Sequence, residues 1–163
     1  MIEKKYQNIN FCGECMNCEE LQARGAIFFE RIDEGFRKYR DEILKMSEEE
    51  AFAFFREKML QYGEENCFAD FYYFCIDEEA RAQVNGVLTE EERAYLKTLE
   101  PKTDVPKQII FALTEPLLRI VVRLNAAEML FSTLYFVGTD KHAPMTYWGN
   151  YGQEYICFSD WCG

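Results

Sequence analysis

Hydrophobic residues between positions 19 and 63 recur at intervals of three and four, the spacing that places side chains on one face of an α-helix. A first set predicts one long helix over residues 19–45, and its members are Leu21, Phe28, Ile32, Phe36, Tyr39 and Ile43. A second set predicts a helix that ends at Gly63, and its members are Phe52, Phe55, Met59 and Tyr62.

Two capping boxes mark helix starts in the first hundred residues. Ser47 with Glu50, and Thr89 with Glu92, place a hydroxyl and a carboxylate three residues apart, so each can satisfy an unpaired backbone amide near the other. The second box predicts a short helix that Pro101 ends. Residues 66–77 also carry aromatic residues at helical spacing, so this part predicts four or five helices.

The pattern changes beyond the proline-containing connector at residues 101–108. Residues 117–124 alternate, and residues 128–137 and 153–161 are rich in β-branched and aromatic residues, which favours strands. Residues 138–144 and 150–152 have the composition of turns. Residues 117–134 also fit a single buried helix, and we favour strands because β-branched residues cluster there.

These patterns predict an α+β fold in one domain over residues 1–163. A mainly helical, acidic portion, residues 1–104, packs on an antiparallel sheet formed by the aromatic-rich residues 105–163. The alternative is a mostly α fold, in which the run near residue 120 is helical.

The formal net charge is −11, and residues 1–104 carry most of it, with 24 Asp and Glu against 14 Lys and Arg. Direct binding to nucleic acid is therefore disfavoured, because contacts with phosphates need clustered cations. An acidic surface suits a basic protein partner, although Glu-rich helices also serve solubility alone. Arg119 and Arg123 are expected to pair with the acidic helices. With no signal peptide and no uncharged apolar stretch of sufficient length, we expect a cytoplasmic protein.

Cys12, Cys15 and Cys18 form a C-x-x-C-x-x-C pattern, a spacing that lets successive thiolates turn toward one metal ion. Zinc needs a fourth ligand, which Cys157 or Cys162 supplies if the two chain ends meet. The pattern then predicts a structural zinc that clips the ends together. An iron–sulfur cluster is a second interpretation, and reduced, metal-free cysteines are a third.

The C-terminal aromatic residues are candidates for contact with a partner, because exposed Tyr and Trp anchor protein interfaces. The four candidates are Trp148, Tyr151, Tyr155 and Trp161, and about half of the aromatic residues in this stretch are expected in the core instead. No catalytic constellation is evident. His142 is the only histidine, so a Cys–His nucleophile would have to use it.

The sequence thus favours a non-enzymatic acidic binding or inhibitor protein with a basic macromolecular partner, such as a nucleic-acid-handling enzyme. Toxin-immunity proteins and phage-encoded inhibitors of defence enzymes share this size and charge. The alternatives are an iron–sulfur or thiol redox protein that uses Cys12, Cys15 and Cys18, and a small cysteine-dependent enzyme.

Overall fold

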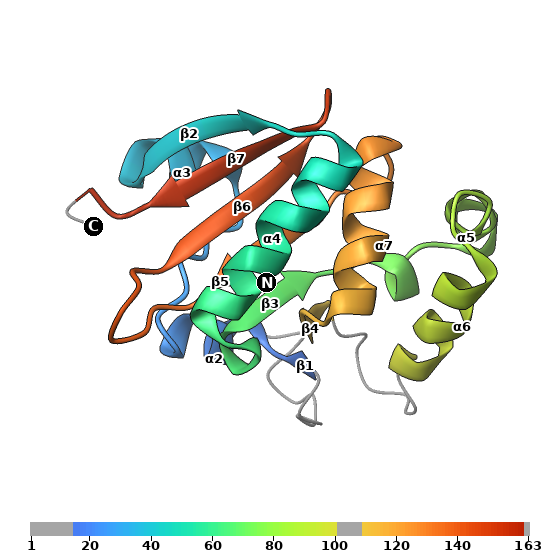
Figure 1. The fold of residues 1–163 in the computed structure, drawn as a ribbon, viewed down its shortest axis with the longest axis horizontal. Coiled ribbons are helices and arrows are strands. Elements are labelled where there is room, and N and C mark those ends of the chain that lie inside the picture. Colours follow the sequence, from blue (N-terminus) through green and yellow to red (C-terminus); the bar gives the residue numbers. More distant parts are fainter. Residues whose placement is uncertain (1–14, 101–108, 162–163) are drawn as a thin grey trace.

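The computed structural model describes residues 15–100 and 109–161, and its strands form one antiparallel sheet (Figure 1). The strand order is β1-β4-β3-β5-β6-β7-β2, and neighbouring strands are antiparallel throughout. The strands are β1 Cys15–Met16, β2 Arg40–Lys45, β3 Cys67–Asp70, β4 Ile110–Ala112, β5 Thr133–Phe136, β6 Met145–Asn150 and β7 Glu154–Ser159.

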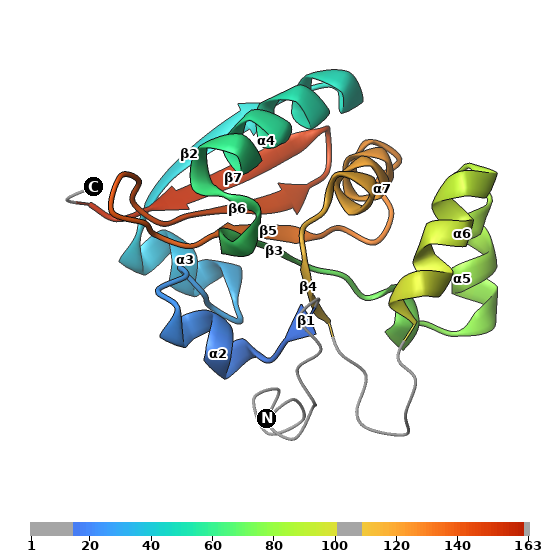
Figure 2. The same ribbon diagram turned by 60° about the horizontal axis from the view of Figure 1, so that its bottom comes forward.

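Helices cover both faces of this sheet, which makes the fold α+β, as the sequence predicted. Figure 2 shows α4 and α7 on one face, α2 and α3 on the other, and the pair α5 and α6 beyond α7. The helices are α2 Cys18–Ala23, α3 Ile32–Lys38, α4 Glu48–Tyr62, α5 Glu78–Asn85, α6 Glu90–Leu99 and α7 Glu115–Ala126, with 3₁₀ turns η1 Glu64–Asn66 and η2 Tyr73–Cys75.

The main core lies between the sheet and helices α4 and α7. Phe55 of α4 is at its centre, with ring centroids 5.0 Å from Tyr147 and 4.9 Å from Tyr155. Each buried aromatic side chain of this kind stabilises the fold by about 2–3 kcal/mol. Side chains alternate along each strand, so Tyr135 of β5 packs with Cys18 on the opposite face of the sheet.

The predicted starts of α4 and α6 and the inner face of α4 are confirmed. Both capping boxes form, with Ser47 and Glu50 at the start of α4 and Thr89 and Glu92 at the start of α6. Gly63 caps the C-terminus of α4, as predicted, and its φ of +90° is in the left-handed region that favours glycine. The four residues predicted for its inner face, Phe52, Phe55, Met59 and Tyr62, are buried.

The preference for strands in residues 117–124 was wrong, because this segment is helix α7. The Thr114 hydroxyl accepts a hydrogen bond from the Leu117 amide at 3.2 Å, and Pro116 lies in the first turn, where it needs no amide partner. Six apolar residues of α7 are buried, and all six belong to the main core, so burial outweighs the β propensity of its valines and isoleucine.

The single helix predicted over residues 19–45 is also wrong. Helix α2 ends at Ala23, Gly25 follows with a φ of +96°, and after α3 the chain enters strand β2. Residues 40–45 pair with β7 at every position, and that long-range pairing overrides the local helical spacing. Residues 67–70 likewise form β3, between β4 and β5, so residues 1–104 contribute strands to the sheet as well as helices.

No helix in residues 15–100 and 109–161 is long and apolar enough to cross a membrane.

Candidate functional site

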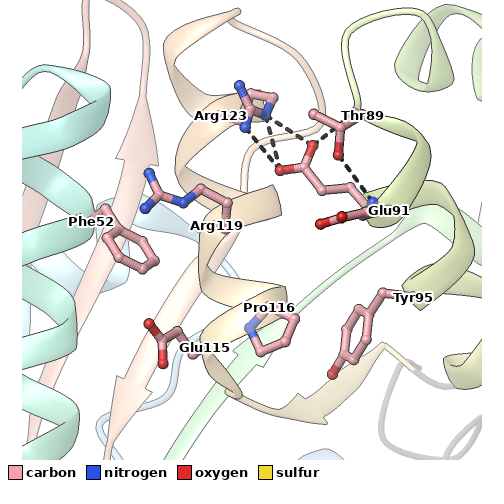
Figure 3. A pocket seen from close by; sticks show the side chains of 9 residues that line it. Phe52, Thr89, Glu91, Tyr95, Glu115, Pro116, Arg119 and Arg123 are labelled. Atoms are coloured by element: carbon pink, nitrogen blue, oxygen red, sulfur yellow. Dashed lines mark hydrogen bonds and ion pairs between the residues drawn. The ribbon is translucent and has the colours of Figure 1, made fainter.

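A groove of about 460 Å³ runs over the outer face of α7, between α4 and α6 (Figure 3). Glu115, Arg119 and Arg123 are four residues apart, so one stripe of α7 forms the floor. Phe52 of α4 lies on one side of the floor, and Tyr95 and the first turn of α6 lie on the other. The groove therefore combines charged groups with aromatic rings.

Arg123 joins the three helices that form this groove. Its Nε and Nη2 each donate a hydrogen bond of 2.9 Å to the Glu92 carboxylate of α6. Its Nη1 lies 3.3 Å from Glu48 Oε2 at the start of α4. Glu92 Oε1 also accepts the backbone N–H of Thr89 at 2.9 Å, so one carboxylate both caps α6 and holds α7.

The charge states of this pair follow from its surroundings. Burial raises the pKa of Glu92, but hydrogen bonds from Arg123 and the Thr89 backbone lower it by more, so the resulting pKa lies below the ordinary value. The hydrogen bond to Glu92 raises the pKa of Arg123. Both groups are therefore charged at neutral pH, and Arg123 is neutralised within the protein.

Arg119 is also neutralised within the protein. Its Nη1 lies 3.0 Å from Glu49 Oε1, and its guanidinium carbon lies 3.5 Å from the centroid of the Phe52 ring, a cation–π contact. The prediction that Arg119 and Arg123 pair with acidic helices is confirmed, although both lie on a helix rather than a strand.

The remaining charge in the groove is negative. Glu91, at the second position of α6, is exposed and forms no hydrogen bond or ion pair with any residue that the structure describes. Within the described part of the chain, the one ionic partner of Glu115 is the exposed Arg56, at 3.5 Å. Because the two arginines of the floor are already paired, the groove presents carboxylates beside the rings of Phe52 and Tyr95. Chemically, such a lining suits a cation.

The cysteines of the predicted metal site are only partly described. Cys12 and Cys162 lie outside the described residues, and Cys15 is described only as part of the backbone of β1. Cys18 and Cys157 are both buried, but they face opposite sides of the sheet, so the structure does not bring Cys157 to Cys18. In residues 15–100 and 109–161 no group of three His, Cys, Asp or Glu residues is placed to hold a metal. The zinc clip stays a prediction.

The four predicted partner contacts do not form one exposed surface. Tyr155 is 1% exposed and belongs to the main core, and Trp148 is half-buried and stacks on Phe29 at 5.7 Å. Tyr151 and Trp161 are 64% and 66% exposed, but they flank opposite ends of β7. They therefore do not form one patch, and Tyr155 is not available to a partner.

The groove itself was not predicted, and only its floor left a signal in the sequence. The spacing of Glu115, Arg119 and Arg123 becomes visible as a stripe only when residues 115–126 are read as a helix. Comparisons of the chain with protein-family models, with curated proteins and with solved structures found no match. The geometry of the groove is therefore the basis for a functional proposal.

Proposed function

We propose that this chain is a non-enzymatic binding protein whose groove between α4, α6 and α7 receives a lysine or arginine side chain of a basic macromolecular partner. The observation that carries the proposal is the unequal pairing of charges in the groove. Arg119 and Arg123 are paired with carboxylates of the protein, whereas Glu91 has no partner among the described residues.

The aromatic residues add to this preference for a cation. Arg119 already lies over the ring of Phe52, which shows that a guanidinium fits against this wall. The Tyr95 hydroxyl, 2.6 Å from Thr114 Oγ1, fixes a second ring at the opposite wall. A partner's arginine between Glu91 and Tyr95 would repeat the arrangement that the protein itself uses on the other side.

The charge of the whole chain supports the same class of partner. A formal net charge of −11 attracts a basic surface from a distance and accelerates association at low salt. A nucleic-acid-handling enzyme has such a surface, and a protein that covers it acts as an inhibitor of the immunity or phage anti-defence type. Such an interaction weakens as salt rises, because salt screens exposed charges.

A binding experiment with matched variants tests the proposal. Fluorescence anisotropy follows a labelled oligo-arginine peptide, with an oligo-glutamate peptide as the probe of opposite charge. Glu91→Lys is compared with Glu79→Lys, which makes the same charge change at the same helical position at the start of α5. We expect Glu91→Lys to weaken binding about tenfold and Glu79→Lys about twofold at most, since only Glu91 lines the groove. Equal losses would show a general charge effect and contradict the proposal.

A further inference from the structure

A second pocket lies between α5, α6 and the turn η2, outside the groove. Its volume is about 370 Å³, within the range of sites for small molecules. Figure 2 shows α5 and α6 side by side, projecting beyond α7 and away from the sheet. The aromatic rings of Tyr73 and Phe74 form the part of the lining that η2 contributes.

Three cations from two helices line this pocket. Arg81 and Asn85 are four residues apart on α5, and Arg93 and Lys97 are four residues apart on α6, so each pair lies on one face of its helix. Glu100 is the one carboxylate among the described lining residues. A basic pocket is unusual in a chain with 29 acidic and 18 basic residues, so its composition calls for an explanation.

Carboxylates of the described residues do not neutralise these cations. Arg81 Nη2 donates to the Ile76 carbonyl at 3.2 Å, and its guanidinium lies 5.2 Å from the centroid of the Tyr73 ring. Arg93 Nη1 donates to the carbonyls of Asn85 and Leu88, at 3.1 and 2.6 Å. These contacts orient the two guanidinium groups but leave their charge uncompensated, unlike those of Arg119 and Arg123.

Arg81 has a further unsatisfied group. Its Nε is buried and has no hydrogen-bond partner among the described residues, and an unpaired buried donor is costly to the folded state. With one edge held by a carbonyl and a ring against its face, this guanidinium is fixed in place before any ligand arrives. A fixed guanidinium loses little conformational freedom when it binds an anion.

We propose that this pocket binds a small molecule that carries an oxyanion, either a phosphate or a carboxylate group. The guanidinium groups of Arg81 and Arg93 and the ammonium of Lys97 bind the oxyanion, because guanidinium forks match the geometry of phosphate and carboxylate oxygens. The rings of Tyr73 and Phe74 pack against the rest of the molecule. This site is separate from the groove and does not depend on the function proposed for it.

Calorimetric titration at low salt tests this site, with inorganic phosphate, pyrophosphate and adenosine monophosphate in one arm and citrate in the other. Saturable binding in the phosphate arm alone assigns a phosphate ligand, and binding of citrate alone assigns a carboxylate. Absence of binding by all four probes at about 10 mM, a concentration that detects even weak sites, overturns the proposal.

Matched charge reversals separate the pocket from the general field of the protein. Lys97→Glu and Lys58→Glu change the net charge equally, but Lys58 lies on α4 beside Phe54 and outside the pocket. We expect Lys97→Glu to weaken binding about tenfold and Lys58→Glu about twofold or less. Arg81→Lys retains the charge and removes the planar fork, so it should also weaken binding several-fold. Equal effects of Lys97→Glu and Lys58→Glu would contradict a local site.

Discussion

The ion pair between Arg123 and Glu92 is expected to stabilise the fold more than the other surface ion pairs. The perturbation is a double-mutant cycle with Arg123→Met, Glu92→Gln and the double variant. Two hydrogen bonds of 2.9 Å and one of 3.2 Å join the two side chains, whose exposed fractions are 28% and 10%. This geometry lies between an exposed pair, worth up to about 1 kcal/mol, and a fully buried pair.

We expect a coupling free energy of about 1.5–3 kcal/mol, the range for hydrogen bonds to charged groups. Urea unfolding measures it, and the Arg123→Met variant should also melt about 4–8 °C lower. The pair Arg119–Glu49 is the matched control, because its Glu49 side chain is 78% exposed. Its coupling should be below about 1 kcal/mol.

The pH dependence supplies a second test of the same pair. The pKa of Glu92 is lower in the folded than in the unfolded state, so its stabilisation is present above the unfolded pKa and is lost as pH falls through the folded pKa. The coupling should therefore decrease in acid, below about pH 4. A coupling that equals the control, or that does not change on acidification, would refute the reasoning.

Three further results are expected from buried groups. Gly149→Ala should lower the free energy of unfolding by about 2 kcal/mol or more, because the added Cβ would meet Asn125 Oδ1 and lie 2.9 Å from the Ser132 carbonyl oxygen. Adding Asn125→Ala should restore part of this free energy, and no rescue would contradict this cause. Burial raises the pKa of Asp70 to about 7, so the folded state binds the proton more tightly than the unfolded state, and the free energy of unfolding should fall as pH rises from about 4 to 7. Asp70→Asn should remove this pH dependence, which urea unfolding at a series of pH values measures. Burial raises the pKa of the Cys157 thiol to about 11, so iodoacetamide should label Cys157 only after the protein unfolds. Peptide mass spectrometry detects the label, and rapid labelling of the native protein would show that strand β7 opens.

Features that depend on neighbouring residues in the chain could be predicted from the sequence. Each capping box is complete within four residues, and the inner face of α4 follows from its spacing, so both were found. Strand β2 could not be found, because its sequence is mostly charged and its pairing partner, β7, is more than a hundred residues away. Helix α7 was ambiguous because its charged stripe is narrow and its β-branched residues favour a strand, so the period of a short apolar run could not decide between the two.

The groove was missed for a related reason. Its floor comes from α7 and its walls from α4 and α6, so its composition depends on helix packing that no local pattern encodes. The aromatic candidates were chosen by residue type alone, and type does not distinguish the buried Tyr155 from the exposed Trp161. The pairing of Arg119 and Arg123 with acidic helices was predictable, because two cations in an acidic chain have many partners.

Chemical-shift mapping tests the proposed cation-binding groove most directly. ¹⁵N-labelled protein is titrated with the oligo-arginine peptide, and the amide shifts are followed residue by residue. We expect saturable shifts that concentrate on Phe52, Glu91, Tyr95 and Arg119, with little change at Tyr151 or Trp161. Shifts that spread over all acidic helices, or that concentrate at Tyr151 or Trp161, would contradict the assignment of the groove as the binding site.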